Sequence, residues 1–84
     1  MEKIKIVVSK NHFKTTDVVV YNLPKISLVD FFSTFDIWGS KGYDRYDDGG
    51  LYFELPEFVY DHIEEFPFIK KYNIEIEKKW KNSL

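Results

Sequence analysis

The chain has 84 residues, no cysteine and a formal net charge of −2, and 19% of its residues are aromatic. This length predicts a single domain over residues 1–84, and the large rings supply the apolar area that a short chain needs for a core. The lack of cysteine excludes disulfides, thiolate zinc sites and cysteine nucleophiles, and no apolar run approaches the ~20 residues of a membrane span, so we expect a cytoplasmic protein without membrane contact.

The N-terminal third predicts two strands. KIKIVV (3–8) alternates between apolar and basic residues, which is typical of a half-buried strand. A polar connection over 9–16 leads to DVVVYNL (17–23), which is rich in β-branched residues. Because this second segment is apolar on both faces, we expect it to lie inside the sheet.

The middle of the chain predicts a helix, a loop and a strand. SLVDFFSTFDIW (27–38) has apolar residues at helical spacing, with Ser27 suited to the N-cap and Gly39 suited to the end. A loop over 39–50 follows. LYFEL (51–55) alternates again and predicts a third strand.

The C-terminal third predicts one more helix and one more strand. PEFVYDHIEEF (56–66) begins with proline, and Pro67 is expected to close the helix. NIEIEKKW (73–80) alternates clearly and predicts the last strand. The order is therefore ββαβαβ, an α+β fold in which two helices pack on one face of a four-stranded sheet and leave the other face partly open.

The charges are unevenly distributed along the chain. Five lysines and two acids give +3 in residues 1–29, ten acids and two basic residues give −8 in 30–69, and five lysines and two acids give +3 in 70–84. Such asymmetry indicates an interaction surface. The simpler alternative is that basic ends and acidic middle neutralise each other in the folded molecule.

The segment GYDRYDDGG (42–50) has the residue types of a cation-binding loop, but its spacing is not that of an EF-hand. Aspartate and glycine are also common turn residues. The chain contains two histidines and shows no nucleophile elbow, phosphate-binding glycine loop or HExxH pattern. We therefore predict no metal, no cofactor and no enzymatic activity.

The strongest functional signal is an acidic, tyrosine-bearing surface over residues 43–65, which hold eight acids and one arginine. On the predicted helix the acids fall at i, i+4, i+7 and i+8 without the lysines that usually accompany them. Tyrosine supplies rigid contact area, and carboxylates steer toward basic partners. The candidate residues are Tyr43, Asp44, Tyr46, Asp47, Asp48, Glu57, Asp61, Glu64 and Glu65, with Trp38 as a further apolar anchor.

These features predict a protein-binding inhibitor or adaptor that docks on a basic site of a partner, such as the nucleic-acid channel of a nuclease. Small acidic inhibitors from phages and mobile elements, including anti-CRISPR and toxin-immunity proteins, act in this manner, and the analogy rests on size and charge rather than on a motif.

Two alternatives stay open. One is a small nucleic-acid-binding module that uses the open sheet face, with Tyr52 as a stacking platform. Its lysines would be Lys3, Lys5, Lys70, Lys71, Lys78, Lys79 and Lys81. The other is a homo-oligomeric structural or regulatory protein that pairs through an exposed strand edge.

Overall fold

A single β-sheet organises the chain in a computed structural model that describes residues 3–11, 13–37, 39, 43–46 and 48–80. In these residues the sheet has five strands in the order β3-β4-β2-β1-β5, and β1 and β5 are its one parallel pair. The strands are β1 (Lys5–Lys10), β2 (Thr15–Tyr21), β3 (Tyr43–Arg45), β4 (Leu51–Pro56) and β5 (Glu75–Trp80).

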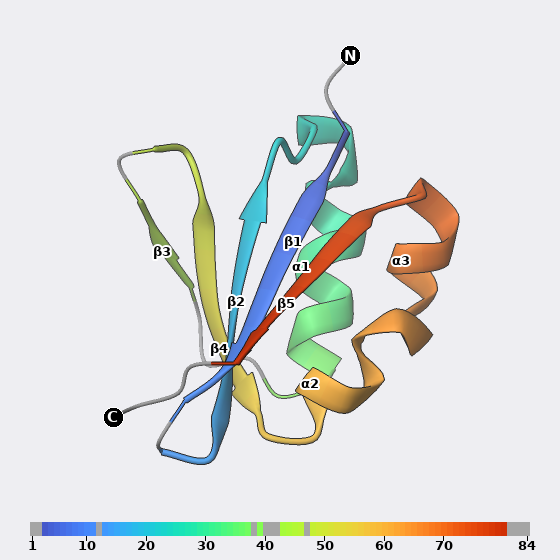
Figure 1. Cartoon of the computed structure of the whole chain (residues 1–84). Helices are drawn as coiled ribbons and strands as arrows, with labels where there is room; N and C mark the ends of the chain where they lie inside the picture. Colours follow the sequence, from blue (N-terminus) through green and yellow to red (C-terminus); the bar gives the residue numbers. More distant parts are fainter. Residues whose placement is uncertain (1–2, 12, 38, 40–42, 47, 81–84) are drawn as a thin grey trace.

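The helices lie together on one face of the sheet (Figure 1). A 3-10 turn, η1 (Lys25–Ser27), leads into α1 (Leu28–Ile37). The connection from β4 to β5 contains α2 (Val59–His62), a second 3-10 turn η2 (Ile63–Glu65) and α3 (Pro67–Tyr72). No helix among the described residues covers the opposite face of the sheet (Figure 1).

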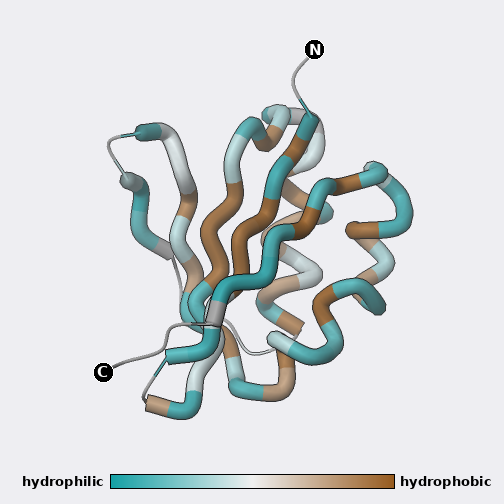
Figure 2. Tube along the Cα trace, in the orientation of Figure 1, coloured by the Kyte–Doolittle hydropathy of each residue, from teal (hydrophilic) through white to brown (hydrophobic). Residues whose placement is uncertain are grey.

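The two strands at the centre of the sheet are the most apolar. Figure 2 shows β1 and β2 as largely hydrophobic, in contrast to the hydrophilic β3 at the edge. Ile6, Val8 and Val18 are fully buried, and β2 lies between β1 and β4, which confirms that the β-branched segment is an interior strand. The hydroxyl of Thr16 donates hydrogen bonds to the carbonyl oxygens of Pro56 and Glu57, at 3.0 and 3.2 Å, and so joins β2 to the end of β4.

Aromatic rings fill the space between sheet and helices. Phe31 and Phe35 of α1 are fully buried, with ring centroids 4.3 Å apart. Both contact Phe53 of β4, at 5.2 and 5.0 Å between centroids. Phe66 packs edge-to-face on Phe35, and Phe68 packs edge-to-face on Phe31. Each such ring buries a large apolar area, so the helical face of the sheet is where most hydrophobic stabilisation arises.

The small α+β class is confirmed, but the four-stranded ββαβαβ arrangement is wrong. The observed order is β1-β2-α1-β3-β4-α2-α3-β5. The segment expected to be a loop over 39–50 contains β3, a strand of three residues that pairs with β4. So short a strand gives little alternation along the sequence, and its pairing with β4 is what makes it a strand.

The second predicted helix is also divided. Pro67 does not close the helical region but begins α3, with Phe66 extended before it (φ −63°, ψ 131°). Proline suits the first helical turn because its missing N–H has no partner there, and it pushes the preceding residue out of the α region. Asn73 ends α3 in the left-handed conformation, and β5 follows.

Candidate surface on the open sheet face

The open face of the sheet collects residues from all five strands. Strand pairing places residues in register across the sheet, and alternate residues share a face. Asp17 pairs with Glu54, Val19 with Tyr52, and Asp44 with Tyr52. On the face away from the helices lie Lys5, Val7, Ser9, Asp17, Val19, Tyr21, Asp44, Tyr52, Glu54, Glu75, Glu77 and Lys79.

The half of this face formed by β1 and β5 is a network of alternating charges. The Lys5 Nζ lies 3.0 Å from a Glu77 carboxylate oxygen and 3.8 Å from one of Glu75. Lys79 also reaches Glu77, at 3.4 Å. The hydrogen bond with Glu77 raises the pKa of Lys5, and hydrogen bonds from Lys5 and Lys79 lower the pKa of Glu77. Lys5 and Lys79, two of the lysines expected to contact nucleic acid on this face, are thus paired with carboxylates, whereas Lys3 forms no ion pair with a described acid.

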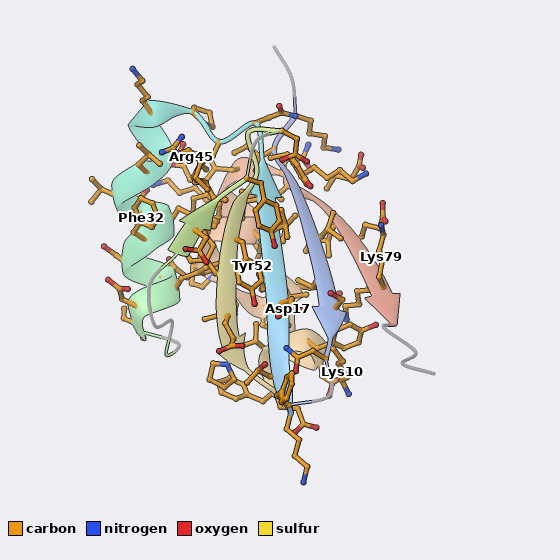
Figure 3. The ribbon with its side chains drawn as sticks, turned by 90° about the vertical axis from the view of Figure 1, so that its left-hand side faces the viewer. Lys10, Asp17, Phe32, Arg45, Tyr52 and Lys79 are labelled. Atoms are coloured by element: carbon orange, nitrogen blue, oxygen red, sulfur yellow. The ribbon has the colours of Figure 1, made fainter. Side chains whose placement is uncertain are left out.

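The other half, formed by β2, β4 and β3, carries tyrosines and acids. The rings of Tyr46 and Tyr52 stack, with centroids 5.7 Å apart and planes 9° from parallel. The Tyr52 hydroxyl donates a 2.8 Å hydrogen bond to Asp17, which Figure 3 shows beside it. Desolvation and then this hydrogen bond raise the pKa of Tyr52 above its ordinary value, so the phenol stays neutral.

Asp17 is a nearly buried carboxylate within this half. It is 8% exposed and also accepts a 2.9 Å hydrogen bond from the Asn11 side chain. Asn11 in turn contacts the hydroxyl of Thr15, and that hydroxyl lies 3.4 Å from a Glu54 oxygen. A buried charge needs such donors because burial costs it its hydration. The network holds the Tyr52 ring in one position on the surface.

The turn between β3 and β4 explains most of the GYDRYDDGG segment. The Tyr46 N–H donates to the Gly50 carbonyl oxygen at 2.8 Å, and the Gly49 N–H donates to the Tyr46 carbonyl oxygen at 3.0 Å. Asp48 accepts a 3.0 Å hydrogen bond from the Gly50 N–H and one of 3.2 Å from the Tyr21 hydroxyl. Asp48 therefore stabilises a hairpin turn, a common use of aspartate.

Gly50 lets this turn lie flat on the sheet. A Cβ at this position would stand 2.9 Å from both a Tyr21 ring carbon and a Val19 methyl carbon. Desolvation, followed by the charge and the hydrogen bond of Asp48, raises the pKa of Tyr21. The hairpin turn and Tyr21 thus form one packed unit on the open face.

The acidic residues predicted to form one surface fall into two groups. Those of the hairpin precede β4 and those of 57–65 follow it, and the six residues of β4 separate them by roughly 20 Å at about 3.3 Å per residue. Figure 1 shows the β3–β4 turn and α2 at opposite ends of the sheet. Strand β4 thus separates the two groups.

Two of the four acids in the helical group, Asp61 and Glu64, are paired with lysines. Asp61 lies 3.9 Å from the Lys10 Nζ, and Glu64 lies 2.9 Å from the Lys78 Nζ. Desolvation is the largest single influence on the pKa of Glu64 and raises it, but the hydrogen bond from Lys78, a backbone hydrogen bond and nearby positive charge together lower the pKa below its ordinary value. Glu65 contacts His62, while Glu57 is exposed at the start of the connection to α2. The partner lysines come from β1 and β5, so spacing along the helix could not reveal them.

The acids of the hairpin and of β4, in contrast, are not paired with described basic residues. Asp44, Asp48 and Glu54 form no ion pair with a lysine or arginine among the residues that the structure describes. Tyr46 is 43% exposed. The side chain of Tyr43, together with Asp47 and Trp38, lies outside the described residues. Sequence analysis overlooked Tyr21 and Asp17, although the period of two in β2 placed them on one face with each other.

Within the described residues, no group of three or more histidine, aspartate or glutamate side chains is arranged to hold a metal ion. None of the helices in that part of the chain combines the length and the apolarity needed to cross a bilayer.

Comparison with known proteins gave no match: no protein-family model, no curated protein and no solved structure is significantly similar to this chain.

Proposed function

We propose that the protein is a non-enzymatic binding protein that docks through the hairpin half of its open sheet face. We call this surface the acidic tyrosine face and define it as Tyr21, Asp44, Tyr46, Asp48, Tyr52 and Glu54. The observation that carries the proposal is the stacked Tyr46–Tyr52 pair beside carboxylates that form no ion pair with a described lysine or arginine.

The partner is a protein with a basic surface. Unneutralised carboxylates raise the rate of encounter with a positive surface, and they take the places that phosphates would occupy on a nucleic-acid-binding protein such as a nuclease. Tyr46 and Tyr52 supply contact area at low cost in conformational entropy, because stacking and the Asp17 hydrogen bond already hold Tyr52 in position.

The helical acids contribute less to this interaction. Asp61 and Glu64 are already partnered by Lys10 and Lys78, so a partner would have to displace those lysines. Glu57, Asp61, Glu64 and Glu65 are therefore assigned to the rim of the interface or to a position outside it, where charge changes act mainly on association rate.

The test is affinity capture from the source cell with the wild type and with the double variant Asp44→Lys/Tyr46→Ala. Asp36→Lys is the matched control, since Asp36 is also exposed but lies on α1, across the sheet from the face. We expect a basic partner that binds the wild type and Asp36→Lys alike. The double variant should bind it at least ~2 kcal/mol more weakly, mostly through loss of the tyrosine contact and charge reversal.

Thermal unfolding of each variant shows whether the fold survives. A partner that binds the folded double variant with wild-type affinity, measured by surface plasmon resonance, would show that the acidic tyrosine face is not the docking site.

A further inference from the structure

A pocket of about 210 Å³ lies behind the hairpin, between the ends of β2 and β4 and the start of α1. Its apolar walls are Val20, Leu23, Leu28 and Leu51, of which Val20 and Leu51 are buried. Gly49 and two basic side chains, Lys25 and Arg45, complete the described lining, and none of the described residues that line the pocket is acidic. The pocket therefore joins an apolar interior to a positively charged margin.

The fold brings these two basic residues together from distant parts of the chain. Arg45 is opposite Leu51 in the β3–β4 ladder, and this register directs it to the helix side of the sheet. Figure 3 shows Arg45 on the side of β3 that faces α1. Lys25 lies in η1, directly before α1. Asp48 is adjacent to Gly49 in the chain, but its carboxylate is bonded to Tyr21 on the open face and so points away from the pocket.

The two cations of the pocket, like Lys3, Lys14 and Lys70, form no ion pair with a described acid. Five other lysines are paired with carboxylates: Lys5, Lys10, Lys71, Lys78 and Lys79. The side chains of Lys25 and Arg45 are both exposed at the margin of the pocket. Their hydrogen bonds to a carboxylate would be charge-assisted, which makes them stronger than hydrogen bonds between neutral groups.

We propose that this pocket binds a small aliphatic carboxylic acid, with its carboxylate on Arg45 and Lys25 and its short branched chain against Val20 and Leu51. The volume of about 210 Å³ suits a small ligand with a short branched chain. A ligand with an ammonium group is disfavoured because both polar side chains of the lining are cationic. The site lies on the opposite side of the hairpin from the acidic tyrosine face, and it does not depend on the docking proposal.

The experiment is a titration of the ¹⁵N-labelled protein with isovalerate, followed by NMR. Isovaleramide, which has the same shape without the charge, is the matched ligand. We expect isovalerate to shift the amide signals of Leu28, Gly49 and Leu51 in a saturable manner, and isovaleramide to bind at least about tenfold more weakly, since it lacks the charge-assisted contact.

Arg45→Gln and Lys25→Gln should each weaken isovalerate binding at least about tenfold by the same reasoning. Lys70→Gln, on the exposed side of α3, is the control and should bind like the wild type. Chemical-shift dispersion like that of the wild type shows that each variant is folded. Because Arg45→Gln and Lys25→Gln are tested separately, one can still be interpreted if the other does not fold. Equal binding of acid and amide, tighter binding of inorganic phosphate than of isovalerate, or shifts unaffected by both substitutions would overturn the proposal.

Discussion

At the scale of single residues, the hydrogen bond between Tyr52 and Asp17 is the most informative contact. Asp17 is a carboxylate with 8% exposure, so losing a donor leaves part of its desolvation uncompensated. We expect Tyr52→Phe to lower the free energy of unfolding by about 1–3 kcal/mol in urea denaturation, because the hydrogen bond is to a charged acceptor.

Tyr46→Phe provides the control for that substitution. It keeps a ring that can stack on Tyr52, and the Tyr46 hydroxyl donates to no described residue, so its stability should stay within about 0.5 kcal/mol of the wild type. Equal stability of both variants would show that the Tyr52 hydroxyl contributes nothing beyond what its ring does.

At the scale of elements, the contact of Asp30 with Lys71 and Tyr72 joins α1 to α3. The distances from the Asp30 carboxylate are 2.7 Å to the Lys71 Nζ and 3.0 Å to the Tyr72 hydroxyl. The hydrogen bond from Lys71, and then that from Tyr72, lowers the pKa of Asp30 below its ordinary value of 3.8. A lowered folded-state pKa means that the contribution to stability is complete above the unfolded pKa and is lost as the pH falls through the folded pKa.

Asp30→Asn should therefore be less stable than the wild type at neutral pH, and the difference should decrease as the pH falls from about 5 toward 2. Urea unfolding at a series of pH values measures this difference. Asp36→Asn, on the same helix and without an ion pair among the described residues, should show little difference at any pH. If the free energy of unfolding of Asp30→Asn is lower than that of the wild type by the same amount at every pH, the loss of stability comes from packing and not from the charge of Asp30.

Sequence patterns were sufficient to predict the longer strands and the longest helix. The period of two identified β1, β2, β4 and β5, and the helical spacing of Phe31 and Phe35 identified α1. The same approach missed β3 and α3, which have three and six residues. A three-residue strand spans fewer than two repeats of its period of two, and a six-residue helix spans fewer than two turns, so neither shows a clear pattern. The formation of β3 and α3 depends on contacts with β4 and α1.

At the scale of the whole molecule, the basic ends and the acidic middle are interleaved. Lys10 and Lys78 reach the acids near α2, and Lys71 reaches Asp30. This supports the simpler interpretation of the charge asymmetry for five of the nine lysines that the structure describes. Among the described acids of the acidic segment it does not extend to Asp36, Asp44, Asp48, Glu54 and Glu57, and three of these, Asp44, Asp48 and Glu54, lie on the acidic tyrosine face.

This distribution predicts weak contact with nucleic acids. Paired lysines release few counterions from a phosphate backbone, which removes the main source of non-specific affinity. In a gel-shift assay at about 50 mM salt, micromolar protein should not retard single- or double-stranded DNA or RNA. A variant in which Glu75 and Glu77 are replaced by Gln frees Lys5 and Lys79 and shows whether retardation becomes possible. Retardation by the wild type would favour the nucleic-acid-binding alternative.

The candidate surface could be predicted only in part. The sequence predicted an interaction surface of tyrosines and acids over residues 43–65, which stays a prediction, and it placed Tyr52 and Glu54 on one face of a strand. It could not indicate that β4 separates Asp44 from Asp61, or that Tyr21 joins the hairpin. Both facts depend on which strands become neighbours, and strand order is decided by contacts between residues distant in the chain.

By itself, the sequence determined the small α+β class, the aromatic core and the interior position of β2, because hydrophobic periodicity and β-branched residues are local properties. The tertiary structure decided which charges remain unpaired. The ion pairs Lys10–Asp61 and Lys78–Glu64 join strands β1 and β5 to the segment around α2. Which acids remain without a lysine partner therefore depends on how the strands and helices pack together. Stacked tyrosines with unpaired carboxylates on one face, and a basic pocket on the other, follow from that arrangement.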